Sequence, residues 1–206
     1  VRDHNGKHRK MLAYAYSAVT SPDPVPTEWF SRLANWDNHL QTLVALHQEG
    51  RADRRLLIEA LPAAWRYRQD DAAIARDSVL ELFRAVHEAS GFSSWGEPSP
   101  RPRGTLTLFR GATAENRHGL SWSTKPATAQ YFANHRQDPQ TRGELWQVRV
   151  PADRCLMFFP DEDELVVDLE GLEHLVRKAE PGAKARPFTR AQAAWLRHLG
   201  ERRAFR

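Results

Sequence analysis

The sequence predicts an α+β fold, with helices in the first half of the chain and short strands in the second. Between residues 27 and 90, apolar side chains recur every three or four positions, which is the spacing of amphipathic helices. From Thr105 onward they occur in short runs bounded by turn residues, which is typical of strands. A stretch rich in Pro, Gly and Ser separates the two patterns. Because helices and strands are segregated along the chain, α+β is favoured over alternating βαβ units.

Four segments follow from these changes in pattern. They are an N-terminal segment and linker at 1–26, a helical subdomain at 27–92, a linker at 93–104 and a strand-rich domain at 105–206. In the helical subdomain we expect one helix from an N-cap at Thr27 to Gly50, a second over 53–69 that is bent or broken at Pro62, and a third over 70–90 that Gly91 closes.

Five strands are expected in the second half of the chain. Their sequences are TLTLFRG (105–111), LSWST (120–124), ELWQVRV (144–150), CLMFF (155–159) and ELVVD (164–168). A helix over 125–135 interrupts them, and Ala129, Phe132 and Ala133 are placed to pack it on the sheet. The chain ends in an amphipathic helix that Thr189 caps.

Composition excludes several classes of protein. The chain has 206 residues, of which 41% are hydrophobic, enough for a packed core. No apolar run approaches the roughly 20 residues that span a bilayer, so no membrane partner is expected. The single cysteine, Cys155, rules out an intramolecular disulfide and a cysteine-rich zinc site, and its apolar strand favours a core role. A reducing, cytoplasmic location is compatible with this.

The chain is basic, and the basic residue is arginine. Of its 30 basic residues 25 are arginines, since lysine occurs only at positions 7, 10, 125, 178 and 184. Arginine suits phosphate recognition. The arginines are scattered and not arranged in a stripe, however, and a GC-rich genome would also enrich them. Binding to nucleic acid therefore stays open and is not indicated.

Common catalytic motifs are absent, and an ordered set of three polar motifs remains. The sequence has no phosphate-binding glycine loop, Cys-x-x-Cys pair, paired-histidine zinc helix or Gly-x-Ser-x-Gly turn, and we expect no metal. The first motif is Arg110–Gly111, at the end of an apolar strand. Second is 119–133, GLSWSTKPATAQYFA. The third is the acidic run 161–164, directly before an apolar strand.

Strand alternation assigns faces within the last two motifs. It puts Ser121 and Ser123 on one face of their strand, with Thr124 and a core residue, Trp122, on the other. Extended through the acidic run, it puts Glu162 and Glu164 on one face. Asp161 and Asp163 then fall on the opposite side, where a solvated turn accounts for them. We expect the face with Glu162 and Glu164 to meet Arg110 and the two serines across the sheet.

In this order the motifs resemble the ADP-ribosyltransferases of the Arg-Ser-Glu class. That class carries an arginine on its first strand, a Ser-Thr-Ser-like strand leading into a helix, and a Glu-x-Glu or Gln-x-Glu opening a later strand. LFRGA, GLSWSTKPATAQYFA and EDELVVD carry the resemblance, over about residues 105–170. Compact bacterial and phage members, among them toxins and an anti-CRISPR enzyme, are the most similar. Lys125 stands where a further serine would be, so Ser121 and Ser123 both remain candidates for the functional serine.

The resemblance implies a split-sheet catalytic domain at 105–206 that uses NAD⁺ as its substrate. It would transfer ADP-ribose to a macromolecule, in the leading hypothesis a protein, and release nicotinamide. A nucleic-acid acceptor and simple NAD⁺ hydrolysis are the enzymatic alternatives, and a basic nucleic-acid-binding module without activity is the alternative of another class. A toxin, effector or anti-defence protein would act in the cytoplasm of its own cell or of a target cell, and could have an inhibitor or immunity partner.

The resemblance also implies a role for each residue. Glu164 would stabilise the oxocarbenium-like transition state, and Ser123 or Ser121 would hold its carboxylate. Glu162 would accept a proton from the incoming nucleophile or orient it. Arg110 would pair with an NAD⁺ phosphate. The remaining NAD⁺-binding candidates are Gly111, Thr124, Tyr131 and Phe132.

Overall fold

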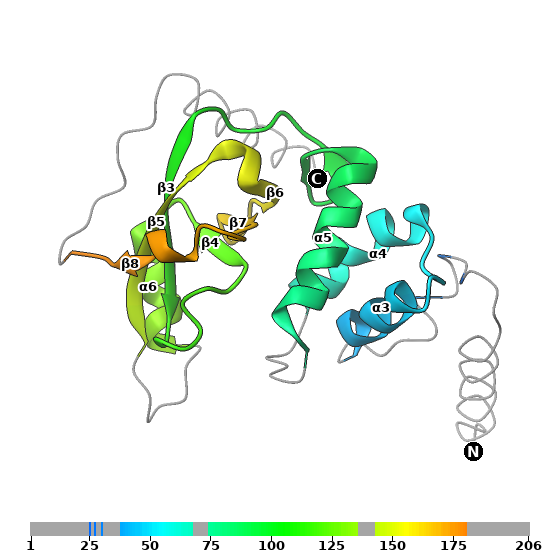
Figure 1. Cartoon of the computed structure of the whole chain (residues 1–206), viewed down its shortest axis with the longest axis horizontal. Helices are drawn as coiled ribbons and strands as arrows, with labels where there is room; N and C mark the ends of the chain where they lie inside the picture. The colour runs from blue at the N-terminus through cyan, green and yellow to red at the C-terminus, as the bar shows by residue number, and fades with distance from the viewer. Residues whose placement is uncertain are drawn as a thin grey trace, which may run out of the picture. The chain divides into compact units, whose positions relative to one another are not determined.

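The computed structural model describes residues 25, 27, 30, 38–67, 74–135 and 143–180. The chain divides into two compact units, Val1–Ser90 and Gly91–Arg206 (Figure 1). In the described residues, the first unit is helical and the second contains a sheet. The predicted α+β class is therefore confirmed. The expected terminal helix from Thr189 lies outside the described residues.

Three helices make up most of the described part of the first unit: α3 (His39–Gln48), α4 (Arg54–Arg66) and α5 (Arg76–Ser90). The amide of Leu56 donates to Oδ1 of Asp53 at 2.7 Å, which caps α4. Gly91 ends α5 in the left-handed region, with φ +75°. The apolar positions of the predicted helices are buried as expected, among them Leu43, Leu82 and Phe83.

Several expectations for this unit differ from the structure. The third helix, α5, begins at Arg76, and residues 74 and 75, which were expected to be helical, are not. Helix α3 begins at His39, and most of 27–37 lies outside the described residues. Helix α4 is not broken at Pro62. Proline removes one intrahelical hydrogen bond. The buried face nevertheless continues past it, because Leu61 and Trp65 both pack inside.

In its described residues, the second unit contains an eight-stranded mixed sheet and one α-helix. The strands are β1 (Ser93–Ser94), β2 (Glu97–Pro98), β3 (Thr105–Ala112), β4 (Ser121–Ser123), β5 (Glu144–Pro151), β6 (Cys155–Phe159), β7 (Glu164–Val167) and β8 (Arg177–Lys178). Their order in the sheet is β2-β1-β6-β7-β4-β3-β5-β8. Helix α6 (Pro126–His135) follows β4. The five predicted strands and this helix are thus confirmed.

The segment expected as a linker, 93–104, belongs to the sheet in part. β1 pairs with β6 in parallel and with β2 in an antiparallel hairpin. Trp95 and Gly96 form the turn, with φ of 56° and 80°. A tight hairpin of this kind needs positive φ and is therefore rich in turn-forming residues, as a linker is. For this reason composition alone did not distinguish a hairpin from a linker.

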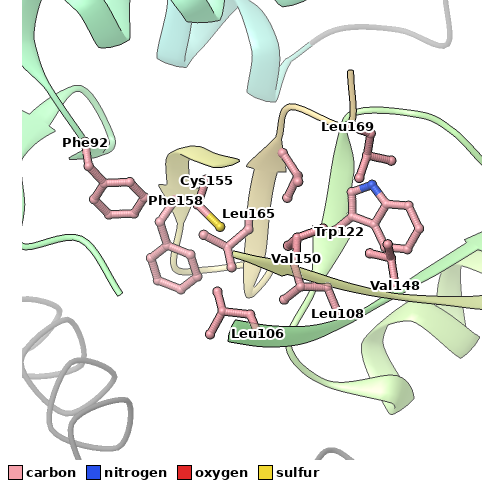
Figure 2. Packing of buried hydrophobic residues seen from close by; sticks show 11 residues of the cluster. Phe92, Leu106, Leu108, Trp122, Val148, Val150, Cys155, Phe158, Leu165 and Leu169 are labelled. Atoms are coloured by element: carbon pink, nitrogen blue, oxygen red, sulfur yellow. The ribbon is translucent and has the colours of Figure 1, made fainter. Parts of the chain in front are cut away.

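One face of the sheet carries the apolar core (Figure 2). Leu106 and Leu108 of β3, Trp122 of β4 and Leu165 of β7 contribute to it. Trp122 is buried here, as alternation predicted. Cys155 belongs to the same cluster, and burial raises the pKa of its thiol to about 12. The thiol is therefore protonated near neutral pH, which fits a core residue and not a nucleophile.

The sheet is joined weakly at one place, between β3 and β4. β3 pairs with β5 along its whole length, from Thr105↔Pro151 to Ala112↔Glu144. With β4 it shares a single register pair, Phe109↔Ser123. β4 in turn pairs with β7 through all three of its residues. We call the Phe109↔Ser123 pair the seam, because it connects the β3–β5–β8 part of the sheet to the part that contains β4 and β7.

Helix α6 packs against β3 and β5 (Figure 1). The contact is closest at Gly111, where an added Cβ would lie 1.9 Å from the carbonyl oxygen of Ala129 and 2.4 Å from the amide nitrogen of Ala133. Ala129 and Ala133 are both buried. Gly111 is therefore required for the close packing of this helix.

We predict that Gly111→Ala lowers the free energy of unfolding by about 3 kcal/mol, because the methyl group would overlap rigid backbone atoms. Denaturant titration monitored by circular dichroism measures this. Gly104→Ala is the matched control. Gly104 has φ +74° and no atom within 4 Å of an added Cβ, so only the conformational cost of about 1 kcal/mol applies. Equal losses in the two variants would contradict the packing explanation.

Candidate functional site

The three sequence motifs come together on three neighbouring strands. Arg110 lies on β3, Ser121 and Ser123 on β4, and Glu164 at the start of β7, and the sheet order places β4 between the other two. Ser123 is the register partner of both Phe109 and Glu164. Motifs that are distant in the sequence thus lie on neighbouring strands around the seam.

Glu164 occupies the first position of β7 and is only 5% exposed. Its neighbours in the sheet are Ser123 on one side and Phe159 on the other. Ser121 lies two residues from Ser123 on the same face of β4, and its register partner is Val166. Of the two candidate serines, Ser123 is therefore the one that register places beside the predicted catalytic carboxylate.

Asp163 is in a different environment from the one predicted. It is 7% exposed and lies in the left-handed region, with φ 51°. Its Oδ2 accepts hydrogen bonds from Thr124 Oγ1 at 2.6 Å and from Ser123 Oγ at 3.2 Å. Lys125 Nζ lies 3.5 Å from its Oδ1. The prediction of a solvated side chain at this position was wrong.

The error arose from extending strand alternation beyond the strand. Residues 160–163 form a turn, and β7 starts only at Glu164. With Asp163 in the left-handed region, the two-residue period does not hold across it. Alternation therefore gives no reason to place Glu162, which is half-buried in the turn, on the face of Glu164. Thr124 follows the last residue of β4, so it reaches the same carboxylate as Ser123, where alternation had put it on the opposite face.

The hydrogen bonds of Ser123 also differ from the expectation. A hydroxyl has one proton, and that of Ser123 is donated to Asp163. The same Oγ accepts the backbone amide of Lys125 at 3.0 Å, just before α6 begins at Pro126. Ser123 therefore does not donate to Glu164, although the two residues are paired in the sheet. It connects the end of β4 to the turn before β7.

Arg110 does not share a face with Ser123 and Glu164. It follows Phe109, the partner of Ser123, so alternation turns it to the opposite face. Its Nε donates to the carbonyl oxygen of Asn116 at 3.0 Å, and its Nη1 to that of Ser121 at 2.8 Å. The predicted meeting of Arg110 with the face that carries Glu164 is thus not found.

The loop between β3 and β4 packs directly on Arg110. A Cβ at Gly119 would lie 2.3 Å from its Nη2, so a side chain at this position would require the guanidinium of Arg110 to shift. Trp122 Nε1 donates to the carbonyl oxygen of Gly119 at 2.8 Å. Sequence reasoning did not single out Gly119 or Asn116. Their contribution comes from backbone atoms, and the only available signal was the glycine itself.

The aromatic candidates lie on α6. Tyr131 is 56% exposed and stacks on His135, with 4.3 Å between ring centroids. Phe132 is half-buried and meets the ring of Tyr131 edge-on at 5.6 Å. Gly111, the other candidate near this helix, packs against the backbone of α6 at Ala129 and Ala133. Contact of these residues with nicotinamide stays a prediction.

Other kinds of site find no support in the parts of the chain that the structure describes. No group of three or more His, Cys, Asp or Glu residues is placed to hold a metal ion there. None of the helices seen there is long and apolar enough to cross a membrane. A surface hollow beside α4, lined by Asp53, Arg54, Arg55, Ile58 and Glu59, lies in the first unit and contains none of the predicted site residues.

Comparison with known proteins finds no relative: no family model, no curated protein and no solved structure matches this chain. A functional assignment must therefore come from the residues of the site and their arrangement.

We predict that Arg110→Ala lowers the free energy of unfolding by about 2 kcal/mol, because two backbone carbonyls beside the seam lose a charged donor. Thermal unfolding measures the change. Arg149→Ala, which removes an exposed arginine from β5, should stay within about 0.5 kcal/mol of the wild type. If the two variants were equally stable, Arg110 would have no structural role.

Proposed function

We propose that this protein is an NAD⁺-dependent ADP-ribosyltransferase of the Arg-Ser-Glu class, which modifies a macromolecule and releases nicotinamide. One observation carries the proposal: the three motifs that resemble this class lie on the adjacent strands β3, β4 and β7, with Glu164 and Ser123 as register partners. Scattered polar residues have no reason to converge in this way. A protein is the proposed acceptor.

One feature of the sheet supports the proposal that it has the split form that the resemblance implies. β3 and β4 share only the seam pair, whereas the strands on either side are joined along most of their length. A sheet that is joined by a single register pair beside a buried glutamate supports a catalytic domain of this type. The resemblance itself spans about residues 105–170, and these include β3 to β7.

The proposed reaction breaks the bond between C1′ of the ribose and the nicotinamide nitrogen. Nicotinamide leaves as a neutral molecule with the bonding electron pair, and positive charge develops on the ribose. A carboxylate fixed in a buried position stabilises that charge more strongly than one in water. Glu164 has this position, at the start of β7 and 5% exposed. The nucleophile of the acceptor then bonds to C1′ and loses its proton, for which Glu162 is the proposed base.

The first role that we assign to Arg110 is to connect β3 and β4 beside the seam. Its two described bonds join β3 to the carbonyl of Ser121 on β4 and to the loop at Asn116. Contact between Arg110 and an NAD⁺ phosphate is part of what the resemblance implies. Its orientation, away from the face of Glu164, lends that contact no support. A toxin, effector or anti-defence role likewise rests on the resemblance.

The most direct test incubates the full chain with NAD⁺ labelled in the adenylate moiety and a bacterial lysate, followed by separation of protein and nucleic acid. Label in the protein fraction is the expected result. Label in the nucleic-acid fraction would change the acceptor class, and nicotinamide release without transfer would indicate a glycohydrolase. Absence of NAD⁺ binding and cleavage, with salt-dependent binding to nucleic acid, would overturn the enzymatic proposal.

Glu164→Gln should reduce both ADP-ribose transfer and NAD⁺ cleavage by about 100-fold or more, because the amide is neutral and cannot stabilise the developing cation. Nicotinamide release, measured by chromatography, gives the rate. The substitution keeps the shape of the side chain, and a thermal melt checks that the fold is kept. Glu97→Gln, at an exposed position of β2, is the control and should retain full activity. An active Glu164→Gln enzyme would remove this residue from the mechanism.

Glu162→Gln should lose transfer to the acceptor while slow NAD⁺ hydrolysis continues, because deprotonating the acceptor matters for transfer, whereas NAD⁺ cleavage depends on Glu164 and not on Glu162. The two rates are followed in one reaction, as label incorporated and nicotinamide released. Retention of both activities would make Glu162 an ordinary residue of the β6–β7 turn.

A further inference from the structure

We infer that Asp163 is a positioning residue that fixes the catalytic glutamate, Glu164, through the hydroxyls of Ser123 and Thr124. The inference rests on the proposed function, since it assigns a task within that reaction. It also goes beyond the resemblance, which gave Asp163 no role and assigned the hydroxyl of the serine to Glu164 itself.

The first support is the place of Asp163 in the chain. It is the last residue of the turn that connects β6 to β7, and Glu164 follows it directly. Its φ of 51° is uncommon for a residue other than glycine, although aspartate tolerates it better than most. A strained backbone of this kind persists only where the surrounding contacts maintain it. At Asp163 those contacts are the hydrogen bonds of its side chain, beside one from its backbone amide to the carbonyl oxygen of Pro160 at 3.4 Å.

The second support is the set of donors around the carboxylate. Three consecutive residues, from the last residue of β4 to the one before α6, supply them: Ser123 at 3.2 Å, Thr124 at 2.6 Å and Lys125 at 3.5 Å. A buried carboxylate is costly unless it is hydrogen-bonded, so these donors and Asp163 stabilise one another. Lys125 is exposed, and an ion pair with an exposed lysine contributes little. The two hydroxyls therefore make the principal contacts.

The third support is that the same residue contacts Asp163 and pairs with Glu164. Ser123 holds Asp163 by its side chain and Glu164 by its place in the sheet. The backbone of Glu164 is thus fixed on its N-terminal side by the turn and laterally by β4. A catalytic group displaced by about 1 Å can lose up to about 100-fold in rate, so such a connection has a kinetic consequence.

The test compares variants that keep the turn and change its contacts. Asp163→Gly adopts positive φ without strain and removes the carboxylate. Asp163→Asn also tolerates positive φ and keeps an oxygen acceptor for the hydroxyls. Thr124→Val removes the shortest of the three contacts and preserves the shape of the side chain. Asp161→Gly is the control, because it removes an exposed carboxylate from the same turn.

For each full-length variant, kcat and KM for nicotinamide release from NAD⁺ are measured beside the wild type and Glu164→Gln, with a thermal melt for folding. We expect Asp163→Gly to lower kcat about tenfold with KM within about twofold, and Thr124→Val to lower kcat in the same way. Asp163→Asn should recover most of kcat, and Asp161→Gly should match the wild type. The double variant of Asp163 and Thr124 should be no worse than Asp163→Gly alone, because both changes break one connection.

The outcomes separate this inference from the proposed function. Wild-type activity that Glu164→Gln abolishes and Asp163→Gly leaves intact would overturn the inference alone. A rise in KM without loss of kcat in Thr124→Val would assign Thr124 to NAD⁺ binding and would also contradict it. A wild-type chain that does not cleave NAD⁺ would overturn both. If Asp163→Gly fails to fold, the other two variants test the inference. A lowered kcat in Thr124→Val with a kcat near the wild type in Asp163→Asn would support it, and an unchanged kcat in Thr124→Val would contradict it.

Discussion

The pairing of Ser123 with its neighbours is the interaction on which the arrangement of the candidate site depends. Its backbone joins β3 to β4 at the seam and lies beside Glu164 of β7, while its hydroxyl contacts Asp163 and the backbone before α6. Because β3 and β4 share no other register pair, the relation between Arg110 and the acidic turn depends on this pair and on the hydrogen bond from Arg110 to the carbonyl oxygen of Ser121. A change in the contacts of Ser123 would therefore alter the positions of both Arg110 and the acidic turn.

Two close approaches of backbone complete the surroundings of the seam. At Gly111 helix α6 comes too near to allow a Cβ, and at Gly119 a Cβ would displace the guanidinium of Arg110. Gly111 thus permits a backbone contact that a larger residue would prevent. The Arg-Gly pair at the end of β3 is therefore explained in part by packing, independently of any ligand. Arg110 meets backbone carbonyls on one face, and Gly111 meets the helix on the other.

The acidic run before β7 contains residues with different physical roles. Asp161 is exposed, Glu162 is half-buried in the turn, and Asp163 and Glu164 are buried. A buried carboxylate needs donors, and the hydroxyls of the β4 segment meet that need at Asp163. Functional sites commonly contain such locally strained and polar positions, because the surrounding fold can hold them in place. The proposed catalytic role of Glu164 would make use of this rigidity.

The sequence by itself determined the fold class, the five principal strands, α6 and the core position of Trp122, because period-two and helical apolar patterns are local properties of the chain. It also singled out the motifs that converge at the seam. Tertiary structure alone decided that β1 joins the sheet, that Arg110 faces away from Glu164, and that Asp163 receives the hydroxyls of Ser123 and Thr124. These depend on register, on one residue with positive φ and on hydrogen bonds between residues about 40 positions apart. Local periodicity carries no information about such contacts.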